Sequence, residues 1–226
     1  MLQGSIKRTF WAAMALCLSV SAGATTIGYD NAMDANGVAK SAVTGVTTVD
    51  FNHGCGYARC TGNYAIRTGR VANAYSAPRL DDAGPNETPF LSAPATIFAD
   101  STASTYTLGQ TANYFGLLWG SIDPFNVISF LDNGRIVARY TGGSLTESSR
   151  SSDHPLAIGD SAYVNFFDLP AYDSIRLTSP ETAFETDNHA YGTVNTASDV
   201  PEPGALGLFA FALVGLGALV RRRAPY

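Results

Sequence analysis

At 226 residues the chain is long enough for one domain with a full hydrophobic core, and its formal net charge is −5. Residues 25–199 are more acidic than the whole chain, because nine Lys and Arg residues stand against 18 Asp and Glu residues there, a net charge of −9. Such a surface repels nucleic acids and anionic membranes, so we expect no nucleic-acid partner.

The first 24 residues have the three consecutive parts of a secretory signal peptide. Lys7 and Arg8 precede an apolar run over residues 10–20, and small residues follow at positions 22–24. The run is short for a membrane span, and its Ala-x-Ala ending suits signal peptidase cutting before Thr25. Residues 1–24 are therefore left out of the predicted fold, and the chain is expected to be exported through the inner membrane.

Two acidic stretches offer hard oxygen ligands that suit calcium. They are Asp30, Asp34 and Asn36 before Gly37, and Asp81, Asp82, Asn86 and Glu87 further along. Neither matches an EF-hand, and acidic solvated loops are the simpler interpretation. We therefore assign no metal ligand and no cofactor, with calcium kept as a candidate.

Cys55 and Cys60 are the two cysteines that remain after the signal peptide. In an exported protein, two cysteines that flank a glycine-bearing loop predict a disulfide. A metal site using His53 with both thiolates is the alternative, although it lacks a fourth ligand at a usable spacing.

Short β-rich runs separated by turn residues predict an all-β fold, a single β-sandwich or jelly-roll domain over residues 25–199. The expected strands cover residues 43–51, 95–99, 105–108, 114–119, 126–131, 135–140, 162–167, 174–178 and 183–186.

Trp119, Asp123 and Asn126 are candidate ligand-binding residues, because an aromatic ring beside polar groups suits a sugar. Trp119 also lies in an apolar run, which favours a core position. The three histidines are scattered and no serine stands in a Gly-x-Ser-x-Gly pattern, so we assign no catalytic residue and do not expect an enzyme.

A β-hairpin is predicted at Asn133 and Gly134, since Asn-Gly tolerates the positive φ angles of a type I′ turn. A two-residue loop would pair Asp132 with Arg135, Leu131 with Ile136, Ser129 with Ala138 and Val127 with Tyr140. Both strands are rich in apolar residues, so we expect a central hairpin buried on most of both sides.

The C-terminal segment, residues 200–226, contains Pro201, Glu202 and Pro203, then an uncharged apolar run over residues 205–220, then Arg221, Arg222 and Arg223. The run predicts a transmembrane helix, and the arginines place its C-terminal end in the cytoplasm. The two prolines keep the segment around Glu202 extended, as a protease site requires. Spacing alone is also compatible with a plain single-pass anchor.

These three parts, in this order, resemble the PEP-CTERM sorting signal. The resemblance implies processing by exosortase, a membrane-embedded enzyme of Gram-negative bacteria that make extracellular polysaccharide. Residues 114–130 and 183–191 are also similar to blocks of exosortase-dependent surface proteins, a family described by its location and sorting rather than by a reaction.

The sequence thus predicts an exported, exosortase-sorted protein of the cell surface or extracellular biofilm matrix, with a structural or binding role. Its expected partners are signal peptidase, exosortase, extracellular polysaccharide and, before cleavage, the membrane. The first alternative is a carbohydrate-binding module with calcium as a candidate cofactor, followed by a secreted hydrolase. Ice binding would need a regular array of threonines, and no such repeat runs through the chain.

Overall fold

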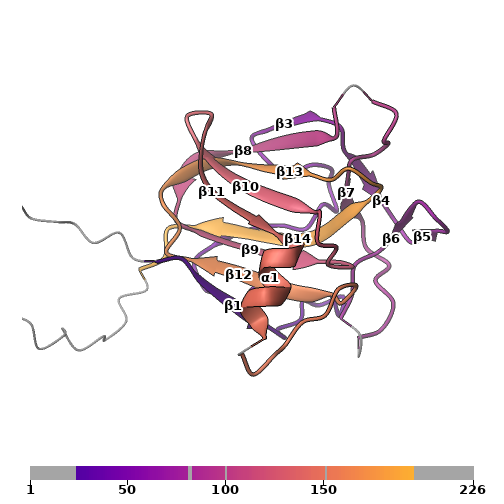
Figure 1. The fold of residues 1–226 in the computed structure, drawn as a ribbon, viewed down its shortest axis with the longest axis horizontal. Helices are drawn as coiled ribbons and strands as arrows, with labels where there is room; N and C mark the ends of the chain where they lie inside the picture. Colours follow the sequence, from indigo (N-terminus) through magenta and orange to yellow (C-terminus); the bar gives the residue numbers. More distant parts are fainter. Residues whose placement is uncertain (1–23, 81–82, 100, 151, 196–226) are drawn as a thin grey trace, which may run out of the picture.

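The computed structural model describes residues 24–80, 83–99, 101–150 and 152–195. Over this part of the chain, two antiparallel sheets pack face to face (Figure 1). The prediction of an all-β sandwich is confirmed. The predicted signal peptide, except for Ala24, and the whole C-terminal segment lie outside the described residues.

The larger sheet has seven strands in the order β1-β12-β9-β14-β7-β4, with β2 pairing with β14 as well. The bounds are β1 (Thr26–Asp30), β2 (Thr47–Val49), β4 (Ala65–Arg67), β7 (Phe90–Ala93), β9 (Tyr114–Trp119), β12 (Ala162–Phe167) and β14 (Phe184–Gly192).

The smaller sheet has five strands in the order β11-β10-β13-β8-β3. The bounds are β3 (Arg59–Gly62), β8 (Ala103–Ala112), β10 (Val127–Asp132), β11 (Arg135–Thr141) and β13 (Tyr172–Thr178). A separate small hairpin joins β5 (Arg70–Val71) to β6 (Tyr75–Ser76). The helix α1 (Gly142–Ser149) follows β11 and begins with a capping box between Thr141 and Ser144.

Two of the expected strands differ clearly from the structure. Residues 95–99 form a loop rather than a strand, since β7 ends immediately before Pro94 and the Asn63 side chain bonds to the backbone of Ala95 and Thr96. The long strand expected over residues 43–51 is reduced to Thr47–Val49. β2 is confined to the three residues that pair with β14.

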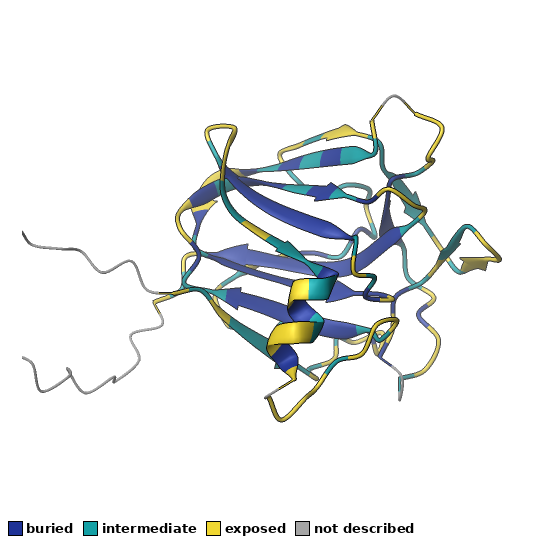
Figure 2. Ribbon diagram, in the orientation of Figure 1, coloured by how far each residue is buried: buried dark blue, intermediate teal, exposed yellow. Residues whose placement is uncertain are grey.

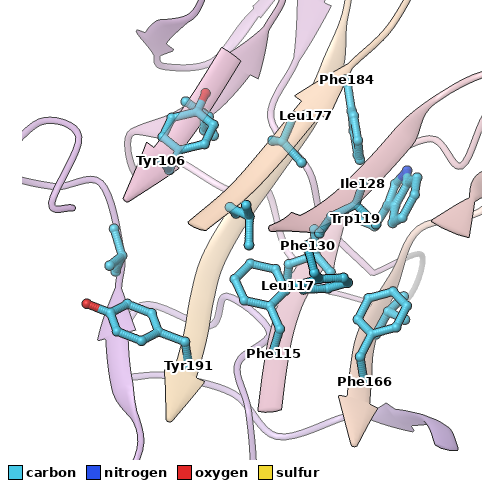
Figure 3. Close-up of a cluster of buried hydrophobic side chains, with 14 of the residues drawn as sticks. Tyr106, Phe115, Leu117, Trp119, Ile128, Phe130, Phe166, Leu177, Phe184 and Tyr191 are labelled. Carbon is cyan, nitrogen blue, oxygen red and sulfur yellow. The ribbon is translucent and has the colours of Figure 1, made fainter. Parts of the chain in front are cut away.

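Aromatic side chains fill the space between the sheets, where the buried residues concentrate (Figure 2). Phe130 of β10 lies at the centre, with ring centroids 5.6 Å from Phe115, 5.5 Å from Phe166 and 4.9 Å from Tyr172. Figure 3 shows Phe115, Phe130 and Phe166 converging from the two sheets. Truncating a core aromatic of this kind costs about 3–5 kcal/mol, so Phe130 is a main determinant of stability.

The predicted turn is present, but the hairpin differs from the prediction beyond it. Asn133 and Gly134 have φ values of 49° and 79°, as a type I′ turn requires. A β-bulge then shifts the register, so that Ala138 pairs with Phe130 instead of Ser129, and Tyr140 with Ile128 instead of Val127. The central position was wrong for β11, which is an edge strand with an exposed start, while β10 is buried. Edge strands accommodate bulges because one side has no ladder to preserve.

A second bulge reverses the alternation of side chains along β14. Glu185 and Asp187 lie on the outer face, and the pairing with β9 then shifts between Asp187 and Ala190, with Asn188 at φ 45°. After this shift His189 and Tyr191 point into the core. One strand therefore supplies carboxylates to the outside of the sheet and aromatic rings to the inside.

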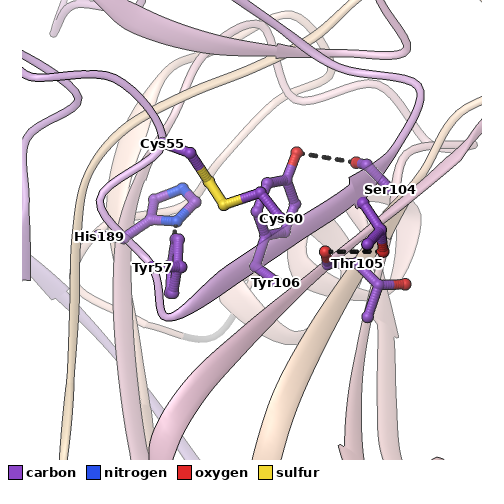
Figure 4. The surroundings of a disulfide bond; sticks show 8 residues. Cys55, Tyr57, Cys60, Ser104, Thr105, Tyr106 and His189 are labelled. Carbon is purple, nitrogen blue, oxygen red and sulfur yellow. Dashed lines mark hydrogen bonds between the residues drawn. A yellow bond between two sulfur atoms is a disulfide. The ribbon is translucent and has the colours of Figure 1, made fainter.

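The predicted disulfide between Cys55 and Cys60 is present, with Cα atoms 6.6 Å apart (Figure 4). The loop that it closes places Tyr57 over the core, where the Tyr57 hydroxyl lies 2.6 Å from Nδ1 of His189. The disulfide therefore holds the loop between Cys55 and Cys60 over the core of the sandwich. Because both sulfur atoms are used in the disulfide, the alternative metal site with His53 does not form.

Both ends of the described domain lie at the same end of the larger sheet (Figure 1). Thr26 pairs with Phe167 on β12, while Gly192 pairs with Tyr114 on β9, and β12 and β9 are neighbours in register at Phe166 and Phe115. The β5–β6 hairpin lies at the opposite end.

Candidate functional site

The three predicted ligand-binding residues do not form one surface. Trp119 is fully buried, with its ring 4.4 Å from that of Phe184, so it offers no exposed face to a sugar and is a core residue. Asn126 is also fully buried, and its backbone oxygen accepts a hydrogen bond from Gly142. Asp123 alone is partly exposed.

Asp123 lines a shallow depression of about 230 Å³ at the end of the sandwich farthest from the chain termini. The β5–β6 hairpin forms one wall through Arg70, Asn73 and Tyr75, and Glu185 of β14 lines the depression as well. The lining segment that contains Asp123 begins at Ser121, two residues after β9 ends at Trp119. Segments far apart in the sequence thus bring two carboxylates to one depression.

Glu185 is the least exposed carboxylate of this depression, with 6% of its surface accessible. Its Oε1 accepts a hydrogen bond of 3.0 Å from the backbone N–H of Ser76. Burial, with a smaller contribution from Asp123, raises the pKa of Glu185 to about 7. Burial and then Glu181 also raise the pKa of Asp123. Near neutral pH, Glu185 can therefore donate or accept a hydrogen bond.

Two further depressions adjoin the first, and all three share Ser76. One, of about 320 Å³, extends from Arg70 and Ser76 to Arg79 and Glu87. The other, of about 170 Å³, runs from Ser76 past Ser121 to Ser161. We call the three together the Ser76 groove. Its lining is mainly polar and carries charges of both signs.

The two acidic stretches considered for calcium approach the same part of β14. Asn188 donates from Nδ2 to Oδ2 of Asp34 at 3.1 Å, and Asn86 donates from Nδ2 to Oδ2 of Asp187 at 3.0 Å. Asp34 also accepts from the backbone N–H groups of Asn36 and Val38. These oxygens are engaged by donors within the protein.

Burial raises the pKa of Asp187 to about 7, which adds a second buried carboxyl of this kind to β14. Within the described ranges, no group of three or more His, Cys, Asp and Glu side chains is arranged to hold a metal ion. Asp81 and Asp82 lie outside those ranges.

The three histidines differ in their exposure to solvent. His189 is fully buried, with Nε2 2.8 Å from Oγ1 of Thr186, and burial lowers its pKa to about 3. His189 is therefore a neutral core residue, while His53 and His154 are exposed.

The most informative residues of the groove, Glu185 and Ser76, were not singled out from the sequence. Glu185 lies in residues 183–191, which resemble a block of exosortase-dependent surface proteins. A carboxylate within this predicted strand was the one feature of the sequence that could have indicated a functional residue there. Residues 70–76 form short strands of two residues each, too brief for their alternation to be recognised.

The domain is a β-sandwich that carries a disulfide, a feature typical of exported proteins because disulfides persist in oxidising compartments. Residues 199–223 match the family model of the PEP-CTERM protein-sorting motif. The chain carries this motif at its C-terminus, and the motif implies an exported protein that exosortase processes and sorts to the surface. No curated protein and no solved structure matches the chain.

The predicted sorting residues lie within the matched range: Pro201, Glu202, Pro203, Arg221, Arg222 and Arg223. They lie outside the described residues, as does the helix expected over 205–220. In the part of the chain that is described, no helix is long and apolar enough to cross a membrane.

Proposed function

We propose that the protein is a non-enzymatic component of the cell surface or the extracellular polysaccharide matrix, where its sandwich has a structural or binding role. The single observation that carries this proposal is the sorting motif, which begins seven residues after β14 ends at Gly192. A soluble cytoplasmic role would not require such a motif.

The arrangement of the domain supports a binding role at a surface. The chain leaves the sandwich beside Gly192, whereas the Ser76 groove lies near Phe184, at the other end of the same strand. Nine residues of strand separate the two ends by about 25 Å. If the protein is attached through its C-terminal end, the groove therefore lies at the end of the domain opposite to the attachment point.

A carbohydrate-binding role is the second candidate, and the Ser76 groove favours it. The aromatic platform expected at Trp119 is buried, so the support comes from Asp123 together with Glu185, Arg70 and Arg79.

The proposal is tested through the tail. Glu202→Ala is expected to leave membrane insertion intact, since the apolar run and the arginines are unchanged, but to slow removal of the tail and accumulate membrane-bound precursor. Replacing Arg221, Arg222 and Arg223 with Ser is expected to weaken retention, because each arginine strengthens the positive-inside bias. That variant should leak outward with its tail attached.

Mass spectrometry of the C-terminal peptide in membrane and released fractions distinguishes these outcomes. Glu147→Gln, on the exposed side of α1, is the control and should be processed like the wild type. If released wild-type protein still ends at Tyr226, or stays uncleaved in the inner membrane, the tail is a plain anchor and the proposal is wrong.

A further inference from the structure

We propose that the Ser76 groove binds an extended, uncharged oligosaccharide, with Glu185 as the central hydrogen-bonding residue. This inference deepens the proposed function and rests on it for the protein's presence outside the cell. The residues that form the groove lie mainly outside the predicted ligand-binding set, which contributes Asp123 alone.

The size of the groove favours an extended ligand. Two of the depressions, of about 230 and 170 Å³, are smaller than ordinary ligand pockets, which begin near about 300 Å³, and the third, of about 320 Å³, only just reaches that size. Because all three meet at Ser76, a chain of linked units can occupy them together. A single compact ligand would contact one depression and leave the others empty.

The charges in the groove favour an uncharged ligand. Asp123, Glu185 and Glu87 supply carboxylates, and Arg70 and Arg79 supply guanidinium groups within the same connected surface. The carboxylates and the net negative charge of the domain would repel a polyanion, and the two arginines would repel a polycation. Hydroxyl groups, which both donate and accept, can bond to each kind of side chain.

Glu185 is positioned before any ligand arrives. Its carboxyl accepts a hydrogen bond of 3.0 Å from the Ser76 N–H, and the residue is 6% exposed, so little side-chain freedom is lost on binding. Its raised pKa lets the carboxyl adjust its protonation to a hydroxyl partner. Asp123 lines the same depression and adds a second oxygen-bearing side chain.

The groove also has an apolar contact for the C–H face of a sugar ring. Val71 of β5 is 47% exposed and lines the first depression beside Tyr75. The Tyr75 ring is held in place by Arg67, whose guanidinium carbon lies 5.0 Å from the ring centroid. Polar groups and a fixed apolar patch thus lie within one depression, as carbohydrate recognition requires.

The test uses the processed protein released by cells, titrated calorimetrically with neutral cello-, xylo- and malto-oligosaccharides, anionic oligogalacturonides and cationic chitosan oligomers. At least one neutral oligosaccharide should bind, and affinity should rise with chain length until the groove is filled. Glu185→Gln should weaken that binding at least about tenfold, the loss expected for a charge-assisted hydrogen bond. Ser76→Trp should abolish it by filling the junction.

Glu147→Gln, at an exposed residue of α1 that does not line the groove, is the matched control and should bind like the wild type. A folding defect is recognised by comparing melting temperatures, and Asp123→Asn provides a second groove variant that leaves Glu185 in place. The proposal is overturned if no neutral oligosaccharide binds, if charged oligomers alone bind, or if all groove variants bind normally. If new reducing ends appear in the oligosaccharide solution, the groove hydrolyses its ligand, and the proposal of a binding site without catalysis is wrong.

The tail assay keeps the two proposals separate. Normal tail removal without oligosaccharide binding overturns the assignment of the groove alone. Binding by a protein whose tail stays uncleaved overturns the sorting proposal alone.

Discussion

Replacing Glu185 with Gln should change how the stability of the domain depends on pH. Gln has the size of Glu, and its Oε1 can still accept the hydrogen bond from Ser76, so the main change is loss of the ionisable group. The pKa of Glu185 is about 7 in the folded protein against 4.5 for an ordinary Glu. Above pH 7 the folded state must hold a buried carboxylate, whereas below 4.5 both states are protonated.

The sign follows from these two values. Between pH 4.5 and 7 the folded state binds more protons than the unfolded state, so stability falls as pH rises through this window. Each pKa unit corresponds to about 1.4 kcal/mol, so Glu185 destabilises the fold above pH 7 by up to about 3 kcal/mol. Glu185→Gln should therefore be more stable than the wild type at pH 8, and the advantage should shrink towards pH 5.

Urea denaturation at pH 5, 6, 7 and 8 measures this difference, provided that the slope with urea stays the same for both proteins. Asp187 and His189 titrate in both proteins, so their contributions cancel in the comparison. Glu147→Gln, which removes an exposed ion pair with Arg150, should show no such dependence on pH. If wild type and Glu185→Gln keep a constant difference from pH 5 to 8, the carboxyl is not buried as described and the reasoning fails.

Three further predictions concern stability and protonation. Replacing Cys55 and Cys60 with Ser should lower the free energy of unfolding by about 2 kcal/mol, since the closed loop is short, and thiol labelling of the denatured wild type should find no free thiol at these positions. Gly134→Val should cost about 1–3 kcal/mol because φ is 79° there, whereas the neighbouring Arg135→Val should change stability by less than about 0.5 kcal/mol; equal melting temperatures would show that the turn is misassigned. The imidazole NMR signals of His189 should stay constant from pH 8 to pH 5, because burial lowers its pKa to about 3, and a midpoint near 6.5 would contradict its buried position.

Strands with a simple local pattern could be predicted from the sequence. Residues 114–119 and 162–167 form β9 and β12 with the expected bounds, because both are short apolar runs in the centre of a sheet. The Asn133-Gly134 turn was equally clear, since the positive φ values that it needs are a property of these two residues.

What the sequence did not reveal depends on contacts between distant segments. The expected strand over residues 183–186 extends to Gly192 in the structure, because Glu185, Asp187 and His189 are polar residues whose burial is possible only with partners such as Ser76, Asn86 and Tyr57. The bulge in β11 likewise depends on its edge position. The Ser76 groove combines five separate segments, so no single stretch of sequence could indicate it.

The chain leaves the domain at one end of the larger sheet, and a short segment joins that end to the sorting motif. The length of this segment limits how far the domain can lie from its point of attachment. Five residues lie between Asn195 and Pro201, and even a fully extended chain over these six steps spans no more than about 22 Å. In the proposed sorting state the folded domain therefore lies within about 22 Å of Pro201, and exosortase must reach Glu202 directly beside it.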